Sequence, residues 1–467
     1  MFLEHYEKLG GTFMKKILAI VTMAAMVAGA AFADPEADFN LAEVSGNASV
    51  TWGVDLDQGK TGFKNETGAK IKLNLVNSGT KSTSGEGIWA ELGIKLDNNM
   101  VIQADGDGKT SAVADGKIVV DVAKLHFYNF YVGIKSGDTT VGKLQLPNAV
   151  RSAWEALSDV AGTSHDQGIV LGYGDNKNIN FEFDFRSNKV NVATDVDNYY
   201  TNDYGLAAQF KLLGSNEFVN GLEATVGGSF QINEKALGAA ASAGYKLALN
   251  DTFYVKPVVG FTMADTDVSA STINPAMNLA GGLVFGWGDE ADSNAGVYYL
   301  DNDQAKKVIP GVGVTVLVPL VENPTIVISP SFYSGSIVEN LTAAATADIK
   351  IPSSGEAGIA VAGGLKYAIA ATDSVTVTPQ VGARFATKGY ANAAKAALDY
   401  ANTDNGGIAD NVAAATDGLL NIKAGLDVAG LINNTTFSVW YQSRNLLQAA
   451  DGAKKLGTIN VQCKISF

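Results

Sequence analysis

The chain is almost free of cysteine and, beyond its first 33 residues, of long apolar runs. Its 467 residues include a single cysteine, Cys463, so an internal disulfide framework is excluded. No later apolar run approaches the roughly 20 residues that a membrane-spanning helix needs, which excludes a helical inner-membrane protein. The remaining structure able to cross a bilayer is a closed β-barrel, because it pairs every backbone N–H and C=O group internally.

Catalytic and metal-binding motifs are also scarce. The chain has three histidines, and the adjacent Ser164-His165-Asp166 is better explained as a polar loop than as a catalytic triad. Acidic pairs such as Asp105 and Asp107 lack the full ligand pattern of a calcium loop. Phosphate-binding, zinc-binding and nucleophile-elbow motifs are missing. We therefore expect no enzyme activity, no metal site and no cofactor.

Positive charge is in short supply. The 34 Lys and Arg residues face 48 Asp and Glu residues, for a net charge of −14. This balance disfavours nucleic acid or anionic lipid as a partner. A pore with this balance prefers cations by default, unless charges at its narrowest point override it.

The start of the chain has the composition of an export signal. Met14-Lys15-Lys16 precedes an apolar run over 17–30, and Ala31-Phe32-Ala33 forms a small-residue cleavage site around Ala31 and Ala33. We predict that translation starts at Met14, that residues 1–33 are removed with the signal peptide, and that the mature chain is 34–467.

The chain ends in a strongly alternating segment. Residues 459–467 carry apolar side chains at odd positions and polar ones between them, the pattern of a strand with one apolar face. A final aromatic on such a strand resembles the assembly signal of bacterial outer-membrane barrels; the alternative is the last strand of a soluble sheet. The predicted signal consists of Ile459, Val461, Cys463, Ile465 and Phe467.

The first strand of the predicted mature chain alternates over 43–56, with Trp52 on its apolar face. It exceeds the usual globular strand of about 5–6 residues and suffices for a tilted membrane strand. Its other face is too polar to pack in a core, and the next predicted strand continues that polar face. The residues that we predict to line a lumen are Glu43, Ser45, Asn47, Ser49, Thr51, Asp55, Lys70 and Lys72.

Alternating segments recur along the rest of the chain, separated by short turns and long polar loops. Tyr245–Gly260 aligns without gaps to Tyr367–Gly382, either as related hairpins or through shared β composition. Prolines in these segments should lie at strand ends or bulges, because each removes a ladder donor. We expect a further strand at Val297 and Tyr299 and a helical piece at Tyr390–Ala401.

The predicted fold class is therefore all-β: a transmembrane antiparallel up-and-down β-barrel of about 16–20 strands, with short helical pieces in its loops. A barrel of this size encloses a water-filled lumen.

A helical pattern follows Pro147 and interrupts the strands. A tight hairpin followed by such a segment resembles the part of general porins that leads into the loop folded inside the barrel. Under this interpretation the constriction is lined by Lys143, Arg151, Glu155 and Asp159. Under the alternatives, residues 100–165 form an external loop, a plug or a periplasmic region with ordinary solvated charges.

The mature start FNLAEVSGNA, followed by VTWGVDL at 50–56, resembles the spirochaete (treponemal) major outer sheath proteins and their Tpr relatives. The similarity continues through Thr67–Leu73 and includes the carboxy-terminal hairpins and Phe467. The resemblance implies an outer-membrane pore, often trimeric, whose surface loops contact host molecules. It also divides the chain into 34–230 and a barrel part, 231–467, although the strand pattern does not require this division.

The leading functional hypothesis is a bacterial outer-membrane porin for passive diffusion of small hydrophilic solutes and ions. The second is a surface adhesin or antigen whose barrel anchors the loops 77–87, 187–203 and 386–418. A soluble periplasmic β-protein is the third. The expected partners are outer-membrane lipid, the barrel-assembly machinery, further copies of the chain in a trimer and, for the adhesin, host extracellular proteins.

Overall fold

The computed structural model of the chain describes residues 42–76, 88–104, 110–136, 167–175, 177–187, 204–231, 235–265, 276–290, 295–300, 308–388, 418–447 and 455–467. The predicted signal peptide, with Ala31 and Ala33, lies outside these ranges. So do the predicted helical piece 390–401 and the predicted constriction residues Lys143, Arg151, Glu155 and Asp159. Within the described residues, no helix is long and apolar enough to cross a membrane.

The described residues form one sheet of 22 strands. In chain order the strands are β1 (Ala42–Asp55), β2 (Thr61–Val76), β3 (Ile88–Ala104), β4 (Thr110–Phe127), β5 (Phe130–Ser136), β6 (Gln167–Gly174), β7 (Ile179–Ser187), β8 (Tyr204–Leu212), β9 (Leu222–Gln231), β10 (Leu237–Tyr245), β11 (Leu247–Ala248), β12 (Phe253–Asp265), β13 (Ala276–Trp287), β14 (Gly311–Pro319), β15 (Thr325–Tyr333), β16 (Leu341–Pro352), β17 (Gly358–Tyr367), β18 (Ile369–Ala370), β19 (Thr376–Ala386), β20 (Leu419–Ala429), β21 (Thr435–Gln442) and β22 (Thr458–Ser466).

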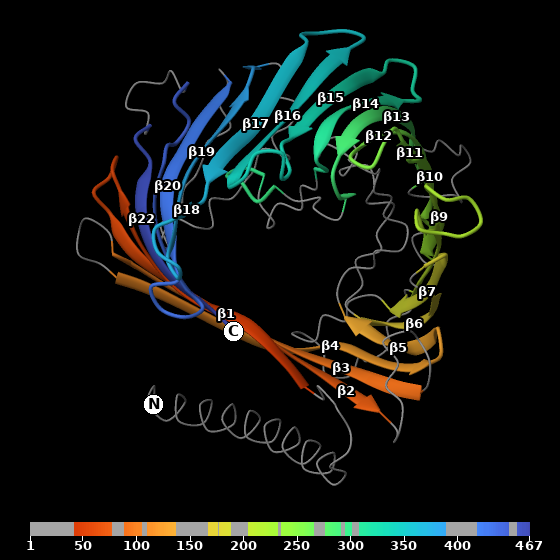
Figure 1. Cartoon of the computed structure of the whole chain (residues 1–467), viewed down its shortest axis with the longest axis horizontal. Helices are drawn as coiled ribbons and strands as arrows, with labels where there is room; N and C mark the ends of the chain where they lie inside the picture. Colours follow the sequence, from red (N-terminus) through yellow and green to blue (C-terminus); the bar gives the residue numbers. More distant parts are fainter. Residues whose placement is uncertain are drawn as a thin grey trace.

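The sheet closes into a ring (Figure 1). Neighbouring strands in chain order pair antiparallel, and β22 pairs with β1 to close the circle. β10 and β11 both pair with β12, and β17 and β18 both pair with β19, so each couple is one interrupted strand. The 22 strands less these 2 short pieces leave 20 in the ring. This confirms the predicted up-and-down barrel, at the upper limit of the predicted strand number.

Prolines explain both interruptions. The register that joins β10 and β11 to β12 places Pro257 opposite Tyr245, where the pairing breaks. The register that joins β17 and β18 to β19 places Pro379 opposite Tyr367, where the pairing breaks in the same way. A proline has no backbone N–H for the ladder. The two hairpins aligned in the sequence thus share one geometry, with each proline inside its strand rather than at a strand end.

The wall of the barrel is apolar outside and polar inside. Along β12, Val259 on one face is 51 % exposed, whereas Thr262 on the opposite face is 1 % exposed. Along β22, Val461 is 45 % exposed and Asn460 is fully buried. A soluble protein buries its apolar face, so this inverted pattern is that of a barrel surrounded by hydrocarbon.

A charge on the outer face should cost far more than a charge on the inner face. We expect Val439→Arg, near the middle of β21 and 42 % exposed, to lower the free energy of unfolding in lipid vesicles by about 2–4 kcal/mol. The matched control is Ser438→Arg, whose side chain faces the other way, beside Asp427 in the β20–β21 register. Equal losses for the two variants would contradict the assignment of the faces.

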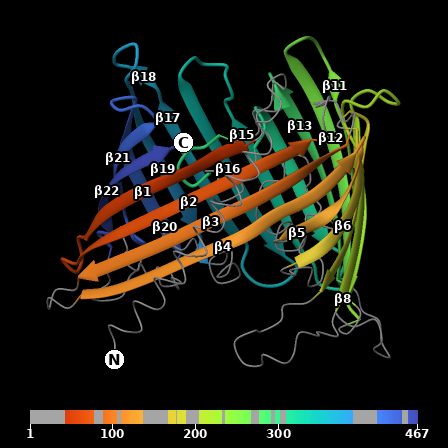
Figure 2. The ribbon, with the colours of Figure 1, turned by 90° about the horizontal axis from the view of Figure 1, so that it is seen from below.

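The connections differ between the two ends of the ring. At one end lie the start of β1, the end of β22 and short turns such as 128–129, 249–252 and 430–434. The other end carries the longest gaps between strands, 137–166 and 387–418. Outer-membrane barrels have short periplasmic turns and longer extracellular loops, which makes the end with the start of β1 and the end of β22 periplasmic. Figure 2 shows the barrel from the side, with the long strands β1–β4 running obliquely across the wall.

Candidate pore and its inner segment

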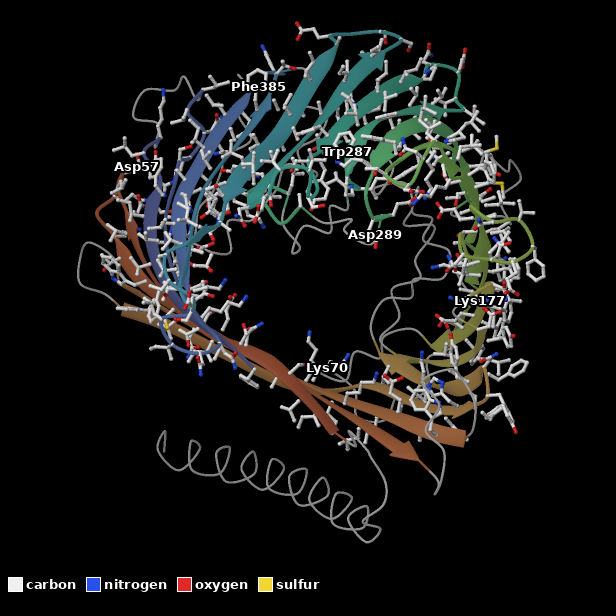
Figure 3. All side chains as sticks on the ribbon, viewed as in Figure 1. Asp57, Lys70, Lys177, Trp287, Asp289 and Phe385 are labelled. Carbon is white, nitrogen blue, oxygen red and sulfur yellow. The ribbon has the colours of Figure 1, made fainter. Side chains whose placement is uncertain are left out.

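The residues predicted to line the lumen occupy one face of β1 and β2. Thr51 is 2 % exposed while its neighbour Val50 is 50 % exposed, so the two faces of β1 differ sharply. Ser45 lies opposite Lys70 in the β1–β2 register, and Lys70 projects into the ring (Figure 3). The inward positions of these two strands are occupied by Ser45, Asn47, Ser49, Thr51, Asp55, Lys70 and Lys72, among others. Glu43 belongs to β1, but its side chain is outside those that the structure describes.

A segment that the sequence suggested as a strand lies inside the lumen instead. Residues 295–300, named here the inner segment, belong to the connection between β13 and β14 at the periplasmic end. Val297 and Tyr299 were expected in a hairpin strand, but among the described residues Val297 makes only an isolated bridge to Leu300. The expected strand is therefore wrong here: the four residues Val297, Tyr298, Tyr299 and Leu300 are all buried, so burial does not alternate along the segment.

The inner segment rests on glycines of the wall. Gly364, Gly382 and Gly425 lie on β17, β19 and β20. A Cβ atom added to them would lie 2.9 Å from the Tyr298 carbonyl oxygen, 2.7 Å from Tyr298 Cβ and 2.4 Å from Tyr298 Oη, respectively. Gly364 and Gly382 are also direct neighbours across the β17–β19 register. Glycine in a strand often marks such a close approach, and here it makes room for Tyr298.

A small apolar core holds the same segment from another side. Val297 and Leu300 are fully buried, and they cluster with Tyr333 of β15 and Ala344 of β16. Val308, close to the start of β14, belongs to the same cluster. Tyr333 and Ala344 occupy inward positions of the wall, so this part of the lumen is lined by an extra layer of chain (Figure 1).

Cations on the wall contact the aromatic rings and the backbone of the inner segment. Lys423 Nζ lies 4.3 Å from the centre of the Tyr298 ring and 5.3 Å from that of Trp440. The Arg384 guanidinium lies 5.1 Å from the centre of the Tyr299 ring. Such cation–π contacts hold aromatic side chains by electrostatic attraction to the ring face. Lys366 Nζ adds a hydrogen bond of 2.8 Å to the Gly296 carbonyl oxygen.

The connection is tethered at its beginning as well. Glu290, shortly after β13, accepts a hydrogen bond of 2.6 Å from Lys256 Nζ and lies 3.2 Å from Lys246 Nζ. The buried Lys256 is also 2.9 Å from Glu223 of β9. Figure 3 shows Asp289, the preceding residue, at the inner side of the ring. The connection between β13 and β14 is thus held at two places. Glu290 is held by lysines of β12 and its neighbour, and the inner segment is held against strands β15–β21.

Comparison with known proteins identifies relatives along nearly the whole chain. No family model matches it. The chain is 29 % identical to the major surface protein MspTL of Treponema lecithinolyticum, over 92 % of this chain and 93 % of that protein. It is also 29 % identical to the major outer membrane protein MspA of Treponema maltophilum, over 97 % of this chain and 100 % of that protein.

The chain is a relative of the treponemal major outer sheath proteins. The resemblance seen in the mature start is thereby confirmed, and so is the predicted location in the bacterial outer membrane. The names of the two relatives and the closed barrel fit a porin-type channel or a structural protein rather than an enzyme.

Two solved structures also match this chain, both at low similarity. Acinetobacter baumannii OccAB2 is 10 % identical with a TM-score of 0.42, covering 91 % of this chain and 98 % of its own. Pseudomonas aeruginosa OprD is 7 % identical with a TM-score of 0.38, covering 91 % of this chain and 95 % of its own. Residue roles must therefore be derived from this chain itself.

A polar and aromatic cluster on β3–β7 was not predicted. The rings of Trp89 and His126 stack with centroids 3.7 Å apart, and His126 lies 5.5 Å from the Tyr131 ring. Tyr131 Oη donates a hydrogen bond of 2.5 Å to Glu182. A Cβ at Gly172 would fall 2.0 Å from the Tyr131 ring, so this glycine accommodates the tyrosine. These residues lie on five different strands, so no local sequence pattern indicates that they meet.

A third cluster joins the first and last hairpins of the barrel, β1–β2 and β21–β22, at the extracellular side. Arg444, between β21 and β22, donates to Asp55 at 2.8 Å and 3.1 Å and also pairs with Asp57 in the β1–β2 turn. Asp57 accepts three backbone hydrogen bonds from residues 455–457, at 2.9, 3.0 and 2.9 Å. We call Asp55, Asp57 and Arg444 the seam clasp. Asp55, predicted to line the lumen, is fully buried within it.

Hydrogen bonds control the charge state of Asp57. Burial raises the pKa of its carboxyl group, but the three backbone N–H groups of 455–457 and the Arg444 guanidinium together outweigh burial. The pKa of Asp57 is therefore held below its ordinary value, and the residue stays ionised at neutral pH.

The predicted assembly signal lies on the closing strand. Ile459, Val461, Ile465 and Phe467 are between 39 % and 53 % exposed, and Cys463 is partly exposed on the same alternating face. Phe467 extends the pairing beyond β22, since its N–H donates to the Gly46 carbonyl at 3.0 Å and its carbonyl accepts from Gly46 at 2.7 Å.

Proposed function

We propose that this chain forms a water-filled outer-membrane channel through which small hydrophilic solutes and ions diffuse passively. The observation that carries the proposal is the closed ring of 20 strands whose inner face is polar and whose outer face is apolar. A barrel of this strand number is wide enough to leave an aqueous lumen between its inward side chains. Among the described residues, the inner segment lies against the β15–β21 side of this lumen.

Single-channel recording tests the proposal. The mature protein, extracted in detergent, is added to a planar bilayer under a salt gradient, and its β content is checked beforehand by circular dichroism. We expect conductance steps of uniform size and a defined reversal potential. Protein that is folded and β-rich but gives no steps would contradict a channel and favour the surface-adhesin function.

Two lysines should influence ion selectivity. Lys70 and Lys95 are exposed, and they lie directly opposite each other across β2–β3 on the inward face. The two side chains place two positive charges at one point of the inward face, where charges lining a pore influence its ion selectivity. We expect the double substitution Lys70→Gln and Lys95→Gln to shift the reversal potential toward stronger cation preference.

The control for this experiment is Lys177→Gln. Lys177 lies in the β6–β7 turn, where it is exposed and pairs with Glu217. The substitution Lys177→Gln removes the same type of charge without altering the inward face of the strands. If the lysine pair and the control leave the reversal potential equally unchanged, the assignment of Lys70 and Lys95 to the conducting path is wrong.

A surface-adhesin function is the second candidate, because one relative is named a major surface protein. The loop 77–87, considered earlier for host contact, connects β2 to β3 and therefore belongs to the periplasmic end. Residues 188–203 and 389–417 connect strands at the other end and remain suitable. Deleting 188–203 should abolish binding to immobilised host matrix protein while sparing conductance, if the adhesin function holds.

The proposed partners follow from the same architecture. Outer-membrane lipid would surround the apolar wall, the barrel-assembly machinery would recognise the closing strand, and three copies would form the native particle. Mass measurement of the detergent-extracted complex tests the last proposal. A particle with the mass of one chain would contradict the trimer.

A further inference from the structure

The wall beneath the inner segment has features that an open aqueous lumen does not require. Tyr333 and Ala344 are 7 % and 3 % exposed at inward positions, where a water-filled barrel normally carries polar side chains. Their partners in the apolar cluster, Val297 and Leu300, are fully buried. The inward face of β15 and β16 is thus apolar where the inner segment packs against it.

The glycines of the wall lead to the same conclusion by a separate route. A glycine within a strand weakens the strand by its conformational entropy and its missing side chain, and it often marks a place where another part of the chain approaches closely. Gly364, Gly382 and Gly425 all have Tyr298 within the space that their Cβ atoms would occupy. These three glycines form the seat of Tyr298 on adjacent strands.

We propose that the inner segment is a fixed constriction, seated by Tyr298, which enters the lumen from the periplasmic end and sets the cross-section of the channel. The proposal rests on the porin function proposed above and specifies which residues limit solute size. A mobile lid would expose Val297, Leu300, Tyr333 and Ala344 to water each time it opened, which burial of apolar surface opposes. The tethers at Glu290 and Gly296 also oppose movement.

The first test replaces one glycine of the seat. In Gly382→Ala, the added Cβ would lie 2.7 Å from Tyr298 Cβ and 2.9 Å from the Tyr298 carbonyl oxygen, so the segment must leave its seat. We expect single-channel conductance to rise roughly twofold and larger neutral polyethylene glycols to enter the channel, because pore width limits both. The matched control is Gly313→Ala, another inward glycine, whose nearest neighbours are the Ser331 and Val284 side chains.

The second test leaves the barrel strands untouched, in case Gly382→Ala fails to fold. Val297→Asp introduces a charge at a fully buried position of the inner segment, and an unpaired charge cannot remain there. We expect the same rise in conductance and in the polyethylene glycol limit. The control is Val321→Asp in the β14–β15 turn, where the parent side chain is 54 % exposed.

The outcomes separate the constriction from the channel itself. A rise for both variants, with controls at the parent level, supports the constriction. Steps of parental size for the folded variants would overturn it while leaving the porin function intact. Spontaneous switching of the parent channel between two conductance levels, abolished in the variants, would also overturn it, because the segment would then be a lid. Absence of steps from the folded parent would contradict the porin function instead.

Discussion

Replacing Arg444 with methionine is expected to destabilise the barrel by about 3 kcal/mol, because it leaves the buried Asp55 carboxylate without its cation. The loss should lie near the lower end of the range for broken buried ion pairs. Asp55 keeps hydrogen bonds from the backbone N–H groups of Asp57 and Gln58 and from the Gln58 side chain. The measurement is urea-induced unfolding in lipid vesicles, followed by tryptophan fluorescence.

The seam clasp has an exposed counterpart that serves as the control. Lys177 and Glu217 form an ion pair whose side chains are 59 % and 66 % exposed. Lys177→Met should therefore cost no more than about 1 kcal/mol, as exposed pairs usually do. If Arg444→Met and Lys177→Met give equal losses, the clasp does not hold the first and last hairpins together.

The pH dependence of the clasp follows from the lowered pKa of Asp57. A carboxyl group whose pKa is lower in the folded state stabilises the fold above its unfolded pKa, about 3.9, and loses that contribution as pH falls through the folded value. We expect the parent to lose stability below about pH 4, and Asp57→Asn to lose less over the same range. Parallel pH profiles for the two proteins would contradict this role of Asp57.

Local patterns in the sequence were sufficient to predict the barrel. A period of two over 43–56 and 459–467 defines the inner and outer faces of β1 and β22, and these strands close the ring as neighbours. The aligned prolines, Pro257 and Pro379, indicated two equivalent hairpins, and their registers agree. Such features depend on residues that are close in sequence, so they can be recognised without the structure.

The inner segment and the seam clasp could not be predicted in this way. Val297 and Tyr299 look like strand residues in the sequence, but Val297 packs against Tyr333 and Ala344. Tyr298 between them sits on glycines of β17, β19 and β20, far along the chain. Arg444 and Asp55 are separated by 389 positions, and neither has a neighbour in sequence that indicates the other. Alternation identifies the face of a side chain but does not show what covers it.

The role of the final residue can be separated from the stability of the folded barrel. Phe467 joins the sheet through two backbone hydrogen bonds to Gly46, and its side chain is 53 % exposed on the outer face. Alanine retains both backbone bonds and loses only contacts of a half-exposed side chain. Phe467→Ala should therefore change the free energy of unfolding of the refolded protein by less than about 1 kcal/mol.

In cells, by contrast, we expect Phe467→Ala to reduce strongly the amount of folded protein in the outer membrane, because the terminal aromatic of the closing strand is the proposed recognition signal for assembly. The control is Phe385→Ala, which removes another outward phenylalanine, 39 % exposed, from β19, away from the closing strand (Figure 3). Surface labelling and heat-modified mobility measure the folded fraction of each variant. Normal surface levels of Phe467→Ala would show that the closing strand assembles through its backbone pairing with β1 alone, and the terminal aromatic would then have no part in assembly.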